Sequence, residues 1–370
     1  ALCRGRRESE MARKRAVTNS ATVMRDRINA GMKSNVVTMG NDPRFTIKRI
    51  PTGSLVVDRL TGGGFARGRH VLLYGDFLVG KSLVLYRTLA LAQQRGETAA
   101  LIDAEGVFDS KWFTALGGDP ASLVIYPDRD SESASRNANE LGNVLRMMIQ
   151  NGEGIEPADV VGIDSVASLL PREEEEHDLE DGDPRVASLA RLMPLLLRML
   201  TTKNDETLFI WTNQWRDKIG RIPGLKSTPG GRALGFFSST SIEMMAGEKE
   251  TESRKVVYKG KEVERKVTLG RWVTCTARKE KTGARPEVTK SFLLNFDTRM
   301  PDETREIIDL GMEDGLIQRR GDRYYVEDMD GKEHSAHGIK KAMALIDANE
   351  ELRDWLLACI SEQSIQLRGH

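Results

Sequence analysis

Four short apolar runs, each followed by polar residues or glycine, recur along the first two-thirds of the chain. They cover residues 71–74 before Gly75, 99–102 before Asp103, 160–163 before Asp164, and 208–211 before Asn213 and Gln214. Apolar residues at helical spacing occupy the intervals, over 82–94, 137–150 and 185–200. Alternation of strands and helices predicts an α/β fold with a mainly parallel sheet. Such sheets bind ligands beyond the carboxyl ends of their strands, where the polar residues above would lie.

The remaining pattern divides the chain into four segments. We expect a disordered basic arm over 1–20, with Met11 as an alternative start, and a helix (21–32) and strand (35–39) within 21–48. The α/β core covers 49–298 and includes a polar strand-like stretch over 249–272, with a hairpin turn at 258–260. A small α+β C-terminal domain covers 299–370, with helices over 304–309 and 338–361.

Composition excludes several classes of protein. The 370 residues contain 55 Lys and Arg and 55 Asp and Glu, so the net charge of zero does not indicate a nucleic-acid partner. The three cysteines are isolated, which excludes a zinc knuckle or a disulfide framework. No apolar run reaches the roughly 18 residues of a membrane span, and no apolar stretch follows the Arg-rich start. We therefore expect a cytoplasmic protein without a signal peptide or membrane anchor.

The strongest motif is a phosphate-binding loop between a predicted strand and a predicted helix. It fits G-x-x-x-x-G-K-[ST] with the residues Gly75, Asp76, Phe77, Leu78, Val79, Gly80, Lys81 and Ser82. Backbone N–H groups of such a loop face a phosphate at a helix N-terminus. We expect ATP as the ligand, with Lys81 on the β- and γ-phosphates and the Ser82 hydroxyl on Mg²⁺.

Three further polar residues follow the other strands. Asp164 is expected to hold Mg²⁺ through water, although an Asp in this position alone is more often a helix cap or turn former. Glu105 could activate the attacking water, and spacing alone leaves this role and an ordinary ion pair equally open. Gln214 could hydrogen-bond the γ-phosphate, or could be a solvent-facing loop residue.

Together these residues resemble the bacterial RecA family of recombinases, over about residues 21 to 360. The resemblance rests on six ordered blocks: 50–69, with Ile50-Pro-Thr-Gly-Ser54 and Thr61-Gly-Gly-Gly64; the phosphate loop; 101–109, with Leu101-Ile-Asp-Ala-Glu105; 163–169; 212–234, with Thr212-Asn-Gln214 and Gly230-Gly231; and 278–311, with Arg278-Lys279-Glu280-Lys281. The resemblance extends to a divergent or virus-encoded member of the family. It implies a RecA-like ATPase core.

The resemblance also implies roles for individual residues. Glu105 is then the hydrolytic carboxylate, Gln214 couples ATP to DNA, and Asp109 and Trp112 hold the adenine. Lys279 and Lys281 match a lysine pair that reaches the γ-phosphate of a neighbouring subunit, much as an arginine finger does. The segment 21–39 matches the element that packs on the adjacent protomer, and Phe236 matches a position at the same interface.

A local excess of basic residues points to DNA. Residues 214–290 contain 18 Lys and Arg against 9 Asp and Glu, although a basic loop alone is more often a solvated surface. By the resemblance, the DNA contacts are Arg191, Arg198, Arg216, Lys218, Arg221, Lys226, Gly230, Gly231 and Arg232. Pro194, between the first two, departs from the family and should kink the helix or mark its start. Eight carboxylates in 173–183 make direct phosphate binding implausible there, and we interpret them as a solvated loop.

The sequence therefore predicts an ATP-dependent homologous recombinase. Its partners would be single-stranded DNA, homologous double-stranded DNA and further copies of the chain in a helical filament, with single-strand-binding and mediator proteins as further candidates. One alternative is a RecA-like hexameric helicase or branch-migration motor. Another is a non-hydrolysing DNA-coating scaffold, since Leu78 and Val79 make the phosphate loop bulkier than usual.

Overall fold

The computed structural model describes residues 20–128, 138–150, 156–169, 188–204, 206–217, 226–258 and 261–366. Contacts divide the chain into two units, Ala1–Lys48 and Arg49–His370. The first unit contains a helix over residues 20–32 and the 3-10 helix η1 (Pro43–Phe45). The acidic segment 173–183 and the hairpin turn residues 259–260 lie outside the described residues.

The predicted strand over residues 35–39 is wrong. These residues have no regular secondary structure. The side chain of Asn29 accepts hydrogen bonds from the backbone N–H groups of Val36 and Val37 at 3.0 and 2.9 Å, and its amide donates to the carbonyl of Val37. The backbone groups that a ladder would use are therefore bonded to a side chain of the preceding helix.

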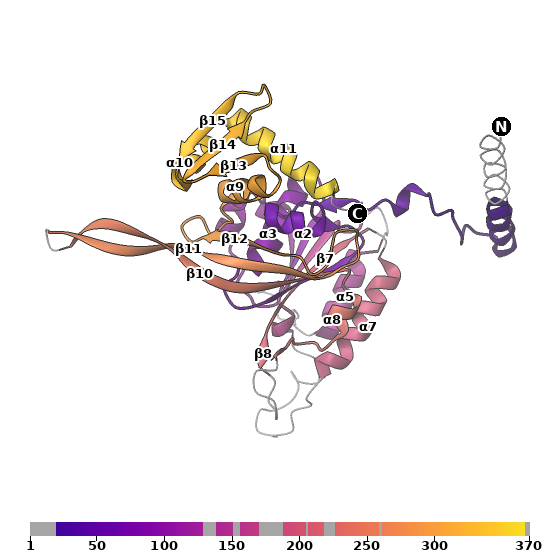
Figure 1. Cartoon of the computed structure of the whole chain (residues 1–370). Coiled ribbons are helices and arrows are strands. Elements are labelled where there is room, and N and C mark those ends of the chain that lie inside the picture. Colours follow the sequence, from indigo (N-terminus) through magenta and orange to yellow (C-terminus); the bar gives the residue numbers. More distant parts are fainter. Residues whose placement is uncertain are drawn as a thin grey trace, which may run out of the picture. The chain divides into compact units, whose positions relative to one another are not determined.

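An eight-stranded sheet forms the centre of the second unit (Figure 1). Its strands, in spatial order, are β12 (Thr289–Asn295), β11 (Lys261–Glu280), β10 (Thr240–Tyr258), β3 (His70–Gly75), β7 (Leu208–Gln214), β6 (Val160–Asp164), β4 (Ala99–Asp103) and β5 (Leu123–Tyr126). Neighbours from β10 to β5 are parallel, and β11 pairs antiparallel with both β10 and β12. The mainly parallel sheet is confirmed, and β5 is a strand that the sequence reading missed.

The other described elements are short strands, helices and a small second sheet. They are β1 (Arg49–Ile50), α2 (Leu55–Thr61), β2 (Phe65–Ala66), α3 (Lys81–Gln94), α4 (Ser110–Ala115), η2 (Pro120–Ser122), α5 (Ala138–Met148), η3 (Val166–Ser168), α7 (Ser188–Lys203), β8 (Arg216–Asp217), β9 (Lys226–Ser227), α8 (Ala233–Phe237), α9 (Glu303–Glu313), β13 (Ile317–Arg320), β14 (Arg323–Glu327), β15 (Glu333–His337), α10 (Ile339–Asp347) and α11 (Glu350–Gln366). No helix within the described ranges is both long and apolar enough to cross a membrane.

Successive side chains of the central strands enter two different cores. Val71 and Leu73 of β3 pack with α2, α3 and α4, whereas Leu72 between them packs with α5, α7 and α8. This alternation is the two-residue period of a strand. A sheet buried on both faces explains why its strands read as continuous apolar runs.

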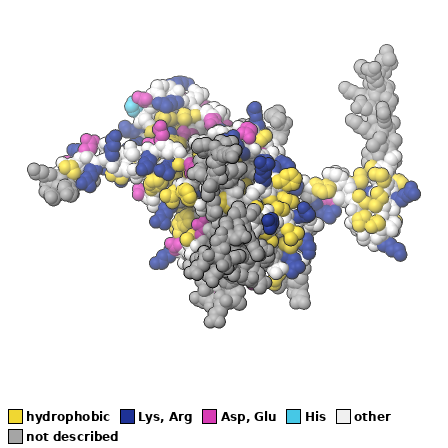
Figure 2. Space-filling model, turned by 90° about the horizontal axis from the view of Figure 1, so that it is seen from below, with side chains coloured by type: hydrophobic (Ala, Val, Ile, Leu, Met, Phe, Trp, Pro, Cys, Tyr) yellow, Lys and Arg dark blue, Asp and Glu magenta, His cyan; other side chains and the backbone are white. Residues whose placement is uncertain are grey.

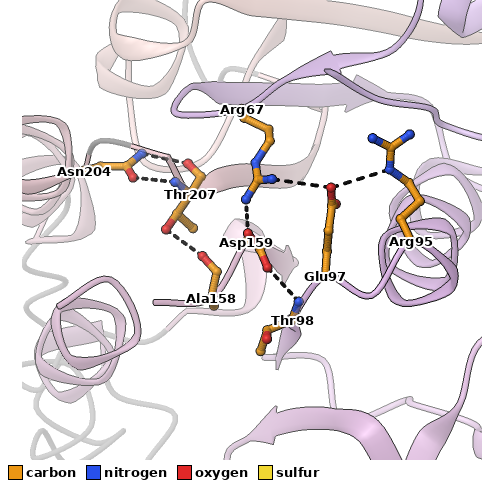
Figure 3. Close-up of polar contacts among 8 residues, drawn as sticks. All are labelled: Arg67, Arg95, Glu97, Thr98, Ala158, Asp159, Asn204 and Thr207. Atoms are coloured by element: carbon orange, nitrogen blue, oxygen red, sulfur yellow. Dashed lines mark hydrogen bonds and ion pairs between the residues drawn. The ribbon is translucent and has the colours of Figure 1, made fainter. Parts of the chain in front are cut away.

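A polar network holds the amino ends of the central strands together (Figure 3). Arg67, just before β3, forms ion pairs with Glu97 at 3.4 Å and with Asp159, which precedes β6. The other carboxylate oxygen of Asp159 accepts the backbone N–H of Thr98, before β4, at 2.8 Å. Because this network occupies the amino ends of the parallel strands, the candidate site is expected at their carboxyl ends.

The hairpin of β10 and β11 extends well beyond the sheet (Figure 1). Only residues 240–244 of β10 pair with β3, and only residues 270–276 of β11 pair with β12. The remaining part is a two-stranded ribbon that carries charged side chains of both signs (Figure 2). The predicted strand-like stretch is therefore a single projecting hairpin.

The C-terminal elements share a hydrophobic core with α2 and the central sheet. Ile307 and Ile308 of α9 and Leu356 of α11 belong to the same hydrophobic cluster as Val57 and Leu60 of α2. Glu306 of α9 also accepts hydrogen bonds from the Ser54 hydroxyl at 2.6 Å and from two N–H groups at the start of α2. The expected small α+β segment is thus anchored on the core.

One helix prediction is wrong, and one of the two alternatives for Pro194 is excluded. The predicted helix over 338–361 is two helices, α10 and α11, because the Asn349 side chain accepts the N–H of Leu352 at 3.1 Å and starts a new helix. Helix α7 runs through Pro194, so the proline does not mark the helix start.

Candidate functional site

The loop between β3 and α3 forms the centre of the site. Gly75 leaves β3 with φ of 141°, and a Cβ atom there would lie 1.9 Å from the carbonyl oxygen of Met244 in β10. Gly80 has φ of 83° and precedes the first residue of the 14-residue helix α3. Both positions favour glycine for these reasons. The loop leads directly into a helix N-terminus, which favours a bound phosphate.

Asp76 fastens this loop to the neighbouring strand. Its N–H donates to the carbonyl of Met244 at 3.0 Å, and its carboxylate accepts the N–H of Ala246 at 3.1 Å. Its carbonyl accepts from the Lys81 ammonium at 2.5 Å. Burial lowers the pKa of Lys81, and the carboxylates of Asp164, Glu105 and Asp76 oppose that shift. The acidic side chain of this phosphate loop, Asp76, is therefore bonded to a backbone N–H of β10.

Asp164, at the end of β6, has one oxygen that suits a metal ion. The Thr212 hydroxyl donates to Oδ1 at 2.6 Å, whereas the buried Oδ2 has no hydrogen-bond partner among the described residues. Burial raises the pKa of Asp164, and the hydroxyls of Thr212 and Ser82 oppose the shift. A hydroxyl and an unpartnered carboxylate oxygen are ligands that Mg²⁺ accepts, so the residues present fit this cofactor.

Glu105 and Gln214 lie in contact. Oε1 of Glu105 accepts hydrogen bonds from the Ser165 hydroxyl at 2.5 Å and from the Gln214 amide at 3.3 Å. The Glu105 N–H donates to the carbonyl of Asp164 at 3.1 Å. Gln214 pairs with Gly75 across β7 and β3, so the ends of β3, β4, β6 and β7 carry one continuous group of side chains.

Sequence reasoning missed the residues that orient this group. Asp103 lies opposite Asp164 in the β4–β6 ladder, and its carboxylate accepts the N–H groups of Val107 and Phe108 at 3.0 and 3.1 Å. It thereby shapes the turn that carries Glu105. The sequence signal for these residues is proximity to a predicted site residue: Asp103 lies two residues before Glu105, Ser165 one after Asp164, and Thr212 two before Gln214.

The two adenine candidates have defined roles within the chain. The Asp109 carboxylate caps α4 by accepting the N–H groups of Lys111 and Trp112 at 2.8 and 3.3 Å. The Trp112 ring lies 5.2 Å from the Tyr86 ring, and its buried indole N–H has no hydrogen-bond partner in the described parts of the chain. Adenine binding by these two residues stays a prediction.

Lys279 and Lys281 lie at the opposite edge of the sheet from the phosphate loop. Lys279 pairs with Ser241, which pairs with Leu72 near the start of β3. The N–H of Lys281 donates to the carbonyl of Ser239, in the turn before β10. Gly75 lies three residues beyond Leu72, roughly 10 Å along β3 at about 3.3 Å per residue, and β10 separates β11 from β3, so the Lys279 side chain does not reach the loop of its own chain.

The ammonium of Lys279 is held on helix α8. It donates to the carbonyls of Gly235 and Phe236 at 2.7 and 2.8 Å. Burial and the charge of Lys281 lower the pKa of Lys279. Phe236 itself is 76% exposed.

The DNA candidates divide into three groups. Arg191 and Arg198 on α7 and Arg232 before α8 are exposed. Gly230 and Gly231 have φ of 77° and 71°, and added Cβ atoms would lie within 3.4 Å of side chains of Met193, Val166 and Ala190, so this pair packs against α7 and its surroundings. The paired strands β8 and β9 contain Arg216 and Lys226, of which the structure describes only the backbone. The described residues do not include Lys218 and Arg221.

One contact joins the nucleotide side of the site to the basic segment, residues 216–232, which carries the DNA candidates from Arg216 to Arg232. The amide of Asn213 donates to the carbonyl of Pro229 at 3.0 Å, and its oxygen accepts the N–H of Gln214 at 2.9 Å. The sequence predicts no role for Asn213. This residue links Gln214 to the end of the segment that leads into Gly230.

Comparison with known proteins gives concordant matches. A family profile described as the RecA N-terminal domain matches residues 21–274. Protein RecA of Saccharopolyspora erythraea is 35% identical over 299 residues, covering 80% of this chain and 79% of that protein. Protein RecA of Thermotoga petrophila is 30% identical over 326 residues, covering 86% and 84%. Protein RecA of Lactobacillus acidophilus is 38% identical over 229 residues, covering 61% and 60%.

Proposed function

Because the chain belongs to the RecA family, we propose that it is an ATP-dependent homologous recombinase. It would form a helical filament on single-stranded DNA, pair that strand with homologous duplex and exchange strands, in recombination and DNA repair. The observation that carries this proposal is the 3.3 Å contact between Gln214 and Glu105. It joins the strand that leads into the basic segment to the carboxylate beside the phosphate loop.

ATP binding would use the loop and the start of α3. Backbone N–H groups from Gly75 to Ser82 would surround the phosphates, and Lys81 would exchange its bond with the Asp76 carbonyl for the β- and γ-phosphates. Ser82 and Asp164 would hold Mg²⁺, which supplies positive charge beside the phosphates when bound.

Hydrolysis would use Glu105 as the base that orients and deprotonates water. The Ser165 hydroxyl at 2.5 Å fixes one oxygen of this carboxylate. The other oxygen, Oε2, is the one that can accept the proton. The Asp103 turn supports this arrangement because it sets the backbone on either side of Glu105.

Coupling to DNA would pass through β7. When the basic segment after Gln214 binds a strand, its position changes the contact between Gln214 and Glu105. The bond from Asn213 to Pro229 supports this route because both ends of the basic segment then meet at β7. Phosphate contacts carry no sequence information, so the two DNA strands would be matched by base pairing.

A second copy of the chain would complete the site. The carboxylates of Asp164, Glu105 and Asp76 act on the pKa of Lys81, and ATP adds further negative charge. Lys279 and Lys281 lie toward the amino end of β3, away from the phosphate loop of their own chain. We therefore assign them to the γ-phosphate bound by a neighbouring copy. A contact between two different faces is heterologous and, unless it closes into a ring, generates a helical filament.

The test is ATP hydrolysis with and without single-stranded DNA, with Lys81→Ala as the matched inactive variant. We expect turnover that depends on DNA and is reduced at least about 100-fold in Lys81→Ala, because the β- and γ-phosphates lose their cation. DNA-independent turnover, or none, would contradict the proposal. Electron microscopy of the DNA complex gives a second check, since closed rings would favour the helicase alternative.

A further inference from the structure

Tyr86 of α3 is a buried tyrosine to which the proposed function gives no role. Its side chain is 1% exposed, and its hydroxyl has no hydrogen-bond partner in the described parts of the chain. The ring packs against the next helix, α4, at 5.2 Å from the Trp112 ring and 6.4 Å from the Phe113 ring. A phenylalanine would make the same ring contacts. Because a hydroxyl that is buried without a partner costs free energy, packing alone does not account for tyrosine at this position.

The position of Tyr86 on α3 directs its side chain toward Asp164. Ser82 and Tyr86 are four residues apart in this helix, so they share one of its faces. Side chains of a helix lean toward its N-terminus, which brings the Tyr86 ring back toward Ser82. The Ser82 hydroxyl is close enough to Asp164 to act on the pKa of that carboxylate as a hydrogen-bond donor. The face of α3 that carries Tyr86 is therefore the face that meets Asp164.

The surroundings of the hydroxyl agree with this placement. Burial raises the pKa of Tyr86, and nearby carboxylates raise it further, first Asp164 and then Asp103 and Glu105. Asp164 acts on the hydroxyl both through its charge and as an acceptor at close range, although the two groups do not have the geometry of a hydrogen bond. Oδ1 of Asp164 accepts the Thr212 hydroxyl at 2.6 Å, whereas the buried Oδ2 has no partner among the described residues. An unpartnered donor and an unpartnered acceptor are thus buried close together.

We propose that Tyr86 is a positioning residue for the metal site, and that its hydroxyl donates a hydrogen bond to Oδ2 of Asp164 when ATP and Mg²⁺ are bound. This inference rests on the proposed function, since it takes Ser82 and Asp164 as the groups that hold Mg²⁺. A carboxylate oxygen has two lone pairs, so Oδ2 can accept from Tyr86 and still bond a water molecule of the hydrated ion. Thr212 on one oxygen and Tyr86 on the other fix the plane of the carboxylate.

The experiment measures the affinity for a fluorescent ATP analogue in EDTA and in saturating Mg²⁺, and its readout is the ratio of the two affinities. Tyr86→Phe keeps the ring and removes only the hydroxyl. We expect it to reduce the gain in affinity from Mg²⁺ about tenfold, because partners that orient a metal-binding carboxylate change metal affinity by about 10- to 100-fold. A purely structural role would change both affinities by the same factor, and an unchanged ratio would overturn the inference. Tyr324→Phe, in the buried part of β14, is the matched control and should leave the ratio unchanged.

Bound Mn²⁺ gives a second measurement of the same site. Electron paramagnetic resonance reports the binding of Mn²⁺ to the complex with a non-hydrolysable ATP analogue. The dissociation constant of Mn²⁺ should rise about tenfold in Tyr86→Phe, for the same reason. Equal constants in the variant and the unchanged protein would count against a role of the hydroxyl in metal binding and would overturn the inference.

Asp164→Asn separates failure of this inference from failure of the proposed function. If Mg²⁺ gives the unchanged protein no gain in affinity, or if Asp164→Asn keeps the full gain, the proposed metal site fails. If Asp164→Asn loses the gain and Tyr86→Phe keeps it, only the present inference fails. Where both hold, the double variant should lose no more than Asp164→Asn alone, because both changes act through one carboxylate. A further tenfold loss in the double variant would show that the hydroxyl acts elsewhere and would overturn the inference.

Discussion

Gly75 illustrates how single residues determine the candidate site. Its backbone turns away from β3 at a point where Met244 of the next strand lies in direct contact. A side chain at this position would have to displace the strand that also holds Asp76 through the N–H of Ala246. The loop geometry therefore depends on the absence of one methyl group.

Gly75→Ala should abolish productive ATP binding. The added Cβ would lie 1.9 Å from a carbonyl oxygen, so the loop must move and the affinity for an ATP analogue should fall at least about 30-fold. Gly96→Ala is the matched control, because Gly96 also has positive φ of 77° but nothing within 4 Å of an added Cβ. Equilibrium binding of a fluorescent analogue gives the measurement, and equal affinities for both variants would contradict the argument.

The elements of the chain differ in how much they depend on their surroundings. Strands β3, β4, β6 and β7 end at one edge because parallel strands alternate with helices. Hairpin residues 245–258 and 261–269 pair mainly with each other. An element of this kind contributes little to the core and is free to carry charges of both signs.

A shortened hairpin should leave the fold intact. Replacement of residues 253–266 by Asn-Gly, a favoured two-residue turn, keeps the pairing of β10 with β3 and of β11 with β12. We expect the free energy of unfolding to change by less than about 1 kcal/mol and the DNA-free binding of the ATP analogue to persist. Urea denaturation and analogue binding check this, and an unfolded product would show that the ribbon supports the core.

At the scale of the whole molecule, the C-terminal segment is joined to α2 by a buried ion pair. Arg59 and Asp314 form hydrogen bonds at 2.7 and 2.5 Å, with side chains only 3% and 10% exposed. Arg59 also donates to the carbonyl of Ile360 in α11 at 3.2 Å. One arginine thus connects three elements that are far apart along the chain.

Asp314→Ala should destabilise the protein by about 3–5 kcal/mol, because a buried guanidinium loses its partner. Asp322→Ala removes the exposed Arg319–Asp322 pair at 3.7 Å and should cost less than about 1 kcal/mol. The free energies of unfolding from urea denaturation give the comparison. Equal losses in the two variants would mean that the Arg59 pair does not support the fold.

Local patterns predicted much of the architecture and part of the site. The strands, the phosphate loop and the residues Glu105, Asp164 and Gln214 follow from short windows of sequence. The strand predicted over 35–39 does not form because the Asn29 side chain bonds the backbone there. Helices α10 and α11 were predicted as one helix because the apolar stripe continues across Asn349, whose side chain starts α11. Strand β5 was not predicted, although its run Leu123–Tyr126 is as long as the four runs that predicted strands.

The sequence by itself determined the phosphate loop, the alternation of strands and helices, and the family to which the chain belongs, because these depend on residue types at fixed spacing. Only the tertiary structure decided that Lys279 lies level with Leu72 across β10, and that Asp164 Oδ2 has no hydrogen-bond partner among the residues that the structure describes. Both depend on strand register and on side chains far apart in the chain. Such contacts are selected by the packing of the whole sheet, which no local pattern specifies.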